Sequence, residues 1–293
     1  MNQTLLKANI TAAGKYLPKK VVTNHDLENI VETSDEWIQS RTGIRERRIV
    51  QNGEATAEMS TNAIRDLMDK HNLPPEEIDA IIIATITPDM MFPSCAALVQ
   101  KNINAINAWG YDLSAACSGF LFALESGAAL IESKRCKKVI VVGADTMSSI
   151  LNFQDRNTCI LFGDGAGAVL LEPSEDENGI QDHIHHCDGE GSEMLRQEAG
   201  GSLNPATHET VDKKMHYLFQ DGRPVFKAAV ISMAEGSIYK AGAFIDKIKK
   251  DQGPLSLGVQ LKTFFNTYIR SGTKIGNTKV LANNFEVYFI EKL

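Results

Sequence analysis

Residues 109–125 read Trp-Gly-Tyr-Asp-Leu-Ser-Ala-Ala-Cys-Ser-Gly-Phe-Leu-Phe-Ala-Leu-Glu. This stretch predicts a strand, a tight turn of small residues and a helix that begins at Cys117. The first N–H groups of a helix lack partners within it and mark the positive end of its dipole. Both effects favour the thiolate, which is the nucleophilic form of cysteine. An isolated cysteine is more commonly a buried structural thiol, so this stretch alone leaves both interpretations open.

Strands and helices alternate on both sides of this stretch. Residues 79–85 form a short unbroken apolar run between two helical patterns, at 57–70 and 95–104. The first pattern places Met59, Ala63, Leu67 and Met68 close to helical spacing, which predicts one apolar helix face. Such a run is typical of a strand buried on both faces of a parallel or mixed sheet. A second apolar run at 138–143 completes a strand–helix–strand unit around Cys117. The alternation predicts an α/β fold.

The chain divides most naturally at the acidic, turn-rich stretch 173–179. We therefore predict a first half over residues 1–172, which carries Cys117, and a second half over residues 173–293. The helical and strand periodicities loosen after about residue 235, and the tail supports no confident element.

Composition narrows the class of protein. The chain has 293 residues, 43% of them hydrophobic, which is ordinary for a soluble protein. A net charge of −7, from 30 basic and 37 acidic residues, argues against nucleic acid as the main partner. No apolar run is long enough to span a membrane, and the N-terminus lacks the apolar region of a signal peptide. Five cysteines without Cys-x-x-Cys spacing are typical of reduced thiols, so we expect a cytoplasmic protein.

Two further motifs are only weak evidence for a phosphate-binding loop and a metal site. The glycines at 163, 165 and 167 precede a strand-like run, whereas a phosphate-binding loop opens a helix, so close backbone packing is the better interpretation. His183 and His185 would share one face of a strand while His186 would point away. A zinc site needs further ligands in tetrahedral geometry, so we expect a solvated strand or loop and no metal.

Trp37 with Arg41 and Arg156 supplies an aromatic ring and two cations. An adenine-bearing thioester carrier such as coenzyme A needs a ring to stack on and cations for its phosphates. A tryptophan among surface arginines is the alternative, and these residues alone do not choose between the two. The neighbouring cluster Arg45, Arg47 and Arg48 is typical of a solvated face. Asn24 is a candidate N-cap for a helix that follows it.

Taken together, these residues resemble the β-ketoacyl-[acyl-carrier-protein] synthase III family of thiolase-like condensing enzymes. The likeness covers about four-fifths of the chain, in order and at family spacing. The matching motifs are Ser-Asp-Glu-Trp-Ile at 34–38, Arg-Thr-Gly-Ile at 41–44, Thr-Pro-Asp at 87–89, Phe-Pro-Ser at 92–94, Asp-Leu-Ser-Ala-Ala-Cys-Ser-Gly-Phe at 112–120, Asp-Arg at 155–156, Phe-Gly-Asp-Gly-Ala-Gly-Ala at 162–168, Val-Phe-Lys at 225–227 and Met-Ala-Glu at 233–235.

The resemblance implies a five-layered α-β-α-β-α fold of two similar halves, assembled as a homodimer. It implies that the Cys117 thiolate takes an acyl group from acyl-coenzyme A, with no permanently bound cofactor. Malonyl-acyl-carrier-protein then loses carbon dioxide, and its carbanion attacks the acyl-cysteine. By resemblance, Trp37, Arg41 and Arg156 fall on coenzyme A contact positions, and Phe226 lies near the acyl channel.

The second half departs from the family pattern. The family carries a Pro-His-Gln-Ala-Asn segment, whose histidine and asparagine are functional, and later a Gly-Asn-Thr motif with a second essential asparagine. In the family, a histidine and an asparagine stabilise the enolate. Here no histidine follows His216, and Asn277 stands in only an echo of the second motif. The second half is therefore incomplete by comparison. The alternatives are an impaired acyl-coenzyme A or carrier-protein binding pseudoenzyme, and a frame-shifted or truncated product of an ordinary family member.

Overall fold

The protein is described by a computed structural model over residues 6–51, 53–174 and 179–232. Contacts divide these residues into two compact units. The first unit contains residues 6–187 and 196–219, and the second contains residues 188–195 and 220–232. Asn277 and the divergent tail lie outside the described residues. The predicted division after residue 172 stays a prediction, because most of the second half also lies outside them.

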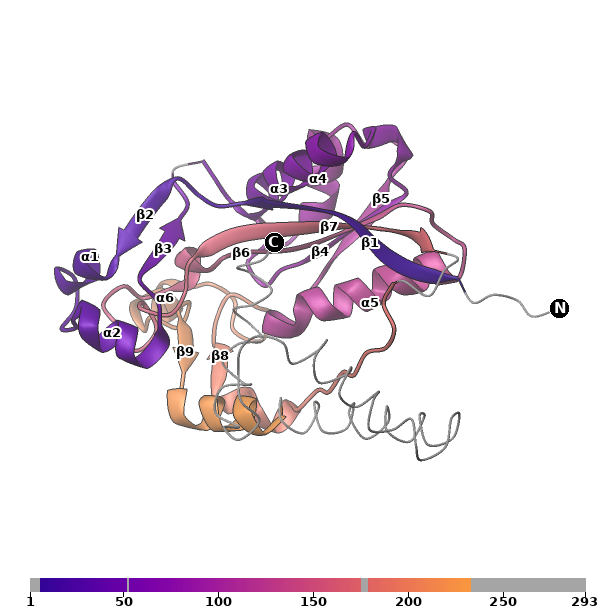
Figure 1. Ribbon diagram of the computed structural model, residues 1–293. Helices are drawn as coiled ribbons and strands as arrows, with labels where there is room; N and C mark the ends of the chain where they lie inside the picture. The colour runs from indigo at the N-terminus through magenta and orange to yellow at the C-terminus, as the bar shows by residue number, and fades with distance from the viewer. Residues whose placement is uncertain (1–5, 52, 175–178, 233–293) are drawn as a thin grey trace, which may run out of the picture. The chain divides into compact units, whose positions relative to one another are not determined.

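A five-stranded mixed sheet is the centre of the first unit (Figure 1). Its strands lie in the order β1, β7, β6, β4, β5. Strand β4 is parallel to both of its neighbours, whereas β7 is antiparallel to β6 and to β1. The prediction of a parallel or mixed sheet is confirmed. The bounds are β1 Lys7–Tyr16, β4 Ala80–Ala84, β5 Trp109–Leu113, β6 Val139–Thr146 and β7 Asp164–Ser174.

Helices cover both faces of this sheet. Helices α3 (Thr56–His71) and α4 (Cys95–Asn102) lie on one face, and α5 (Gly119–Glu132) lies on the other (Figure 1). All five residues of β4 are buried as a result, which explains the unbroken apolar run in the sequence. The described part of the fold thus has three layers, in the order α-β-α. The other two predicted layers would belong to the second half.

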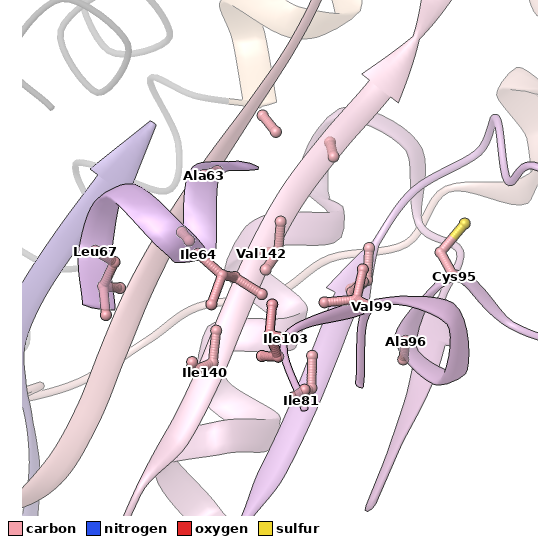
Figure 2. Close-up of a cluster of buried hydrophobic side chains, with 14 of the residues drawn as sticks. Ala63, Ile64, Leu67, Ile81, Cys95, Ala96, Val99, Ile103, Ile140 and Val142 are labelled. Atoms are coloured by element: carbon pink, nitrogen blue, oxygen red, sulfur yellow. The ribbon is translucent and has the colours of Figure 1, made fainter. Parts of the chain in front are cut away.

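Alternate residues of each strand enter opposite cores. On the α3 and α4 side, Ile81 of β4 and Ile140 of β6 pack with Ile64 and Val99 of the helices (Figure 2). On the α5 side, Ile82 of β4 joins the second core. The apolar face of α3 predicted from the sequence is therefore the face that contacts the sheet.

Two short helices precede α3. Helix α1 spans Asn24–Glu28, and helix α2 spans Asp35–Thr42 with Ser34 as its N-cap. The predicted N-cap Asn24 is wrong, because Thr23 takes that place: its hydroxyl accepts from the Asp26 N–H, and the Asp26 carboxylate accepts from the Thr23 N–H. The Asn24 side chain is instead buried.

Strands β2 (Lys20–Thr23) and β3 (Glu46–Ile49) pair antiparallel beside these helices. The predicted solvated face of Arg45, Arg47 and Arg48 is wrong at its centre, since Arg47 is buried. Arg47 is buried because alternate side chains of a strand point to the same side. On β3, Arg47 and Ile49 therefore both point inward and are buried.

The remaining elements are short, and none of the helices among the described residues is long and apolar enough to cross a membrane. Strands β8 and β9 form a two-stranded sheet. The bounds are β8 Leu195–Gln197, β9 Leu218–Gln220 and α6 His208–Asp212, with 3-10 helices at Pro75–Glu77, Ala116–Ser118, Met147–Ile150 and Gly189–Glu193.

Candidate active site

Cys117 lies on the turn that joins β5 to α5, and its side chain is exposed. The helix begins at Gly119, two residues later than predicted, because a 3-10 turn over Ala116–Ser118 comes first. Ala116 has a φ of 45°, a left-handed conformation that is uncommon for a residue with a Cβ. The Ser118 N–H donates to the Ala115 carbonyl at 3.2 Å and closes the turn. The strand, sharp turn and helix predicted around Cys117 are therefore present.

The carboxyl ends of β4 and β6 lie beside this turn and are joined by Asp145. Its Oδ1 accepts from the hydroxyls of Thr85 and Thr87, at 3.0 and 2.9 Å, and from the Ile86 N–H at 2.9 Å. Thr85 in turn donates its N–H to the carbonyl of Leu113, the last residue of β5, at 3.1 Å. Burial raises the pKa of the Asp145 carboxyl. Sequence reasoning missed this residue, although an aspartate at the end of an apolar strand is a recognisable signal.

A second carboxylate fixes the start of α4. Asp112 of β5 accepts the N–H groups of Cys95 and Ala96, at 2.7 and 2.9 Å. Helix N-termini favour such a negative charge. Cys95 itself is buried, and burial raises the pKa of its thiol to about 12, with the nearby Asp112 and Asp89 carboxylates adding to the effect. Cys95 is therefore unsuited to act as a nucleophile near neutral pH.

Trp37, Arg41 and Arg156 lie together, as predicted for a ring with two cations. The Arg156 guanidinium carbon lies 4.7 Å from the centre of the Trp37 ring, and that of Arg41 lies 5.8 Å from it. Trp37 and Arg41 are one turn apart on α2, whereas Arg156 comes from the turns at 155–161. Arg156 also donates to the Glu32 carbonyl at 3.0 Å. Beneath them, Ile38 of α2 and Ile160 share one buried cluster with Leu27 and Cys159.

Phe226 belongs to the second unit, and 64% of its surface is exposed. Because the two units are not placed relative to one another, its predicted position near an acyl channel stays a prediction.

The glycine-rich stretch leads into β7, as expected for a packing role. A Cβ on Gly163 would lie 3.0 Å from the Cβ of Arg47 and from the carbonyl oxygen of Arg48, so only glycine fits there without a shift. A Cβ on Gly167 would meet nothing within 4 Å, so close packing requires glycine at only some positions of the stretch.

The histidine segment lies against α5. His183 and His185 have no regular secondary structure, and both rings pair with the Glu125 carboxylate, the first at 2.6 Å. Their ring centres are 5.2 Å apart. Among the residues that the structure describes, no group of three or more histidine, cysteine or carboxylate side chains is arranged to hold a metal ion.

Comparison with known proteins identifies the family. The family model described as 3-Oxoacyl-[acyl-carrier-protein (ACP)] synthase III matches residues 111–189, which include Cys117. A curated relative from Chlorobaculum tepidum, the β-ketoacyl-[acyl-carrier-protein] synthase III, is 57% identical over 233 residues. This match covers 78% of the chain and 71% of the relative. The chain belongs to the β-ketoacyl-[acyl-carrier-protein] synthase III family.

Other members agree with this assignment. The Koribacter versatilis synthase III is 52% identical over 231 residues, covering 78% of the chain and 69% of the relative. The crystal structure of the Aquifex aeolicus 3-oxoacyl-[acyl-carrier-protein] synthase III superposes with a TM-score of 0.70 at 44% identity, covering 78% of the chain and 69% of that structure. The thiolase-like α/β fold class is confirmed, and the family is one of acyl-transferring condensing enzymes.

Proposed function

We propose that this chain is a β-ketoacyl-[acyl-carrier-protein] synthase III in which Cys117 accepts an acetyl or short acyl group from acyl-coenzyme A. The acyl-cysteine then condenses with malonyl-acyl-carrier-protein, and the β-ketoacyl product begins fatty-acid synthesis. The observation that carries the proposal is the exposed Cys117 on the sharp turn between β5 and α5. It stands in a chain that is 57% identical to a synthase III over most of its length.

The first half-reaction needs little more than an accessible thiolate. The Cys117 sulfur attacks the thioester carbonyl, the carbonyl electrons move onto oxygen, and the coenzyme A thiolate leaves as the oxyanion collapses. A new thioester bond to Cys117 replaces the one to coenzyme A.

Trp37, Arg41 and Arg156 are our candidate coenzyme A contacts. A flat ring offers a stacking surface for adenine, and guanidinium groups pair with phosphates through two parallel hydrogen bonds. Arg156 already lies 4.7 Å from the ring centre, so ring and cation form one surface that a nucleotide can contact.

The hydrogen-bond donors that the second half-reaction requires lead to a second candidate function. Loss of carbon dioxide from a malonyl thioester develops an enolate that needs hydrogen-bond donors. The family resemblance assigns these donors to a histidine and an asparagine, yet no histidine follows His216 in this chain. An acyl-accepting protein with impaired condensation, able to bind acyl-coenzyme A or carrier protein, is therefore the alternative.

Intact-mass spectrometry after incubation with acetyl-coenzyme A tests the first half-reaction. We expect one acetyl group on the wild-type chain and none on Cys117→Ala. Cys187→Ala is the matched control, because Cys187 is the other exposed cysteine and should be dispensable. Failure of the wild-type chain to take up an acetyl group, or equal uptake by Cys117→Ala, would contradict the proposal.

A condensation assay with malonyl-acyl-carrier-protein separates the two candidate functions. Formation of β-ketoacyl product at the rate of a complete family member would support the full synthase and remove the alternative. Acetylation of Cys117 without product would support the impaired protein. In either case we also propose that the chain forms a homodimer, supported by the exposed edge strand β5. We propose a cytoplasmic location as well, supported by five cysteines without Cys-x-x-Cys spacing.

A further inference from the structure

Arg47 is a charged side chain in the interior, with 5% of its surface exposed. Its Nη1 and Nη2 both donate to Asn24 Oδ1 at 3.0 Å, and Nη2 also donates to the Ile160 carbonyl at 2.9 Å. Its Nε has no acceptor among the described residues. Burying a cation is costly unless it is hydrogen-bonded, and an apolar side chain would fill such a space at lower cost. The position therefore calls for a reason other than packing.

Asn24, with 1% of its surface exposed, connects Arg47 to both ends of α2. Its Nδ2 donates to Asp35 Oδ1, at the first residue of the helix, and to the Ile44 carbonyl, just beyond the helix C-cap, both at 2.8 Å. With two N–H groups donated and two bonds accepted, the amide uses its full hydrogen-bonding capacity. Helix α2 carries Trp37 and Arg41, so Asn24 fixes the element that holds them.

The other end of the Arg47 guanidinium fixes the turn that carries Arg156. Ile160 lies in a series of turns in which the Cys159 N–H donates to the Asp155 carbonyl at 3.0 Å and the Leu161 N–H donates to the Thr158 carbonyl at 3.1 Å. Holding the Ile160 carbonyl therefore restrains the backbone on both sides of Arg156.

We propose that Arg47 is a positioning residue that sets the spacing between α2 and the turn at 155–161. It acts through Asn24 on Trp37 and Arg41, and through the Ile160 carbonyl on Arg156. This inference rests on the proposed function, in which those three side chains contact coenzyme A. A flat guanidinium reaches both partners at once, whereas a lysine ammonium is a single point of donation.

The test compares Arg47→Met with Arg48→Met, whose side chain is partly exposed and pairs with the exposed Glu46. Each variant is given two acyl donors: acetyl-coenzyme A, and acetyl-N-acetylcysteamine, a thioester without a nucleotide. We expect Arg47→Met to raise KM for acetyl-coenzyme A about tenfold, as when a charge-assisted contact is lost. Its rate of acetylation by the small thioester should stay at the wild-type value. Arg48→Met should change neither quantity.

A second variant protects the test against poor folding of Arg47→Met. Asn24→Asp keeps two acceptor oxygens for Arg47 but removes both N–H donors to the ends of α2. It should raise KM for acetyl-coenzyme A in the same way. The inference would be overturned if KM for acetyl-coenzyme A were unchanged in both variants, or if acetylation were impaired equally with both acyl donors. If the wild-type chain accepts no acyl group, the proposed function fails instead. In that case, the affinity of the wild-type chain and of each variant for coenzyme A is measured by calorimetry. Equal affinity of all variants would overturn the inference.

Discussion

At the scale of single residues, the five cysteines differ in their surroundings more than in their sequence contexts. Cys95, Cys136 and Cys159 are buried, and burial raises the pKa of each thiol. Cys117 and Cys187 are exposed. Since only an accessible thiolate reacts, this exposure agrees with the sequence motif that indicates Cys117 as the candidate nucleophile, and it sets the three buried thiols apart.

Alkylation should follow this division. At about pH 8, iodoacetamide should modify Cys117 and Cys187 and leave Cys95 unmodified, as peptide mass spectrometry would show. The chain denatured in urea is the control and should be modified at all five positions. Modification of native Cys95 as fast as Cys117 would contradict the described burial.

Asp145 should make stability depend on pH. Burial raises the pKa of its carboxyl in the folded chain, so the folded chain keeps this proton at pH values where the unfolded chain has lost it. Its contribution to the free energy of unfolding therefore falls as pH rises above the ordinary range of an aspartate. Asp145→Asn removes this titration, so the variant should gain stability relative to wild type as pH rises above about 4, the ordinary pKa of an aspartate.

Urea unfolding across that pH range measures the difference. The same substitution at Asp69, on the exposed surface of α3, is the control and should leave the profile parallel to wild type. A parallel profile for Asp145→Asn as well would show that this carboxyl does not contribute as described.

At the scale of elements, the sequence predicted what depends on periodicity. The apolar run at 79–85 became β4, and the spacing of Met59, Ala63 and Leu67 became the buried face of α3. Prediction from the sequence failed where contacts between distant residues determine the position of a side chain. Asn24 looked like a cap, but its amide bonds Arg47, which no local pattern places beside it.

The candidate site was predictable to a similar extent. The turn at Cys117 and the cluster around Trp37 follow from local motifs and from family resemblance. Asp145 was missed because its partners, Thr85 and Thr87, are remote in sequence and meet it only where neighbouring parallel strands end. Register between strands brings such groups together, and register depends on the packed sheet.

The contact between β1 and α3 depends on a glycine. A Cβ on Gly14 would lie 2.3 Å from the Ala63 carbonyl oxygen and 2.5 Å from the Leu67 nitrogen, both backbone atoms of α3. Gly14→Ala should therefore force the helix away from the sheet and lower the free energy of unfolding by about 1–3 kcal/mol or more. Thermal and urea unfolding would measure the loss.

Gly167→Ala is the matched control. Gly167 pairs with Lys15 on the neighbouring rung of the same β1–β7 ladder, and a Cβ there meets nothing within 4 Å. We expect unchanged stability or a small gain, because alanine loses less backbone entropy on folding. A similar loss in both variants would refute the close approach at Gly14.

At the scale of the whole molecule, the sheet ends in two edge strands, β1 and β5. Strand β5 is short and largely exposed, with 50% of the Trp109 surface accessible and Tyr111 stacked beside it. An uncovered edge with aromatic side chains is suited to pair with another chain. This supports the homodimer that the family resemblance implies.

Trp109→Glu should therefore shift the chain from dimer to monomer in analytical ultracentrifugation, because it places a charge in the proposed interface. Ile10→Glu, on the opposite edge strand β1, is the control and should leave the mass unchanged. A monomeric wild-type chain, or a dimer that survives Trp109→Glu, would argue against an interface at β5.

The central claim is that the exposed thiol of Cys117 is an acyl acceptor, and peptide mapping tests it most directly. The chain is incubated with isotopically labelled acetyl-coenzyme A, digested at acidic pH to preserve thioesters, and its peptides are analysed by mass spectrometry. We predict that the label is recovered on the peptide that contains Cys117. Label recovered on Cys187 or elsewhere, or no label at all, would contradict the account.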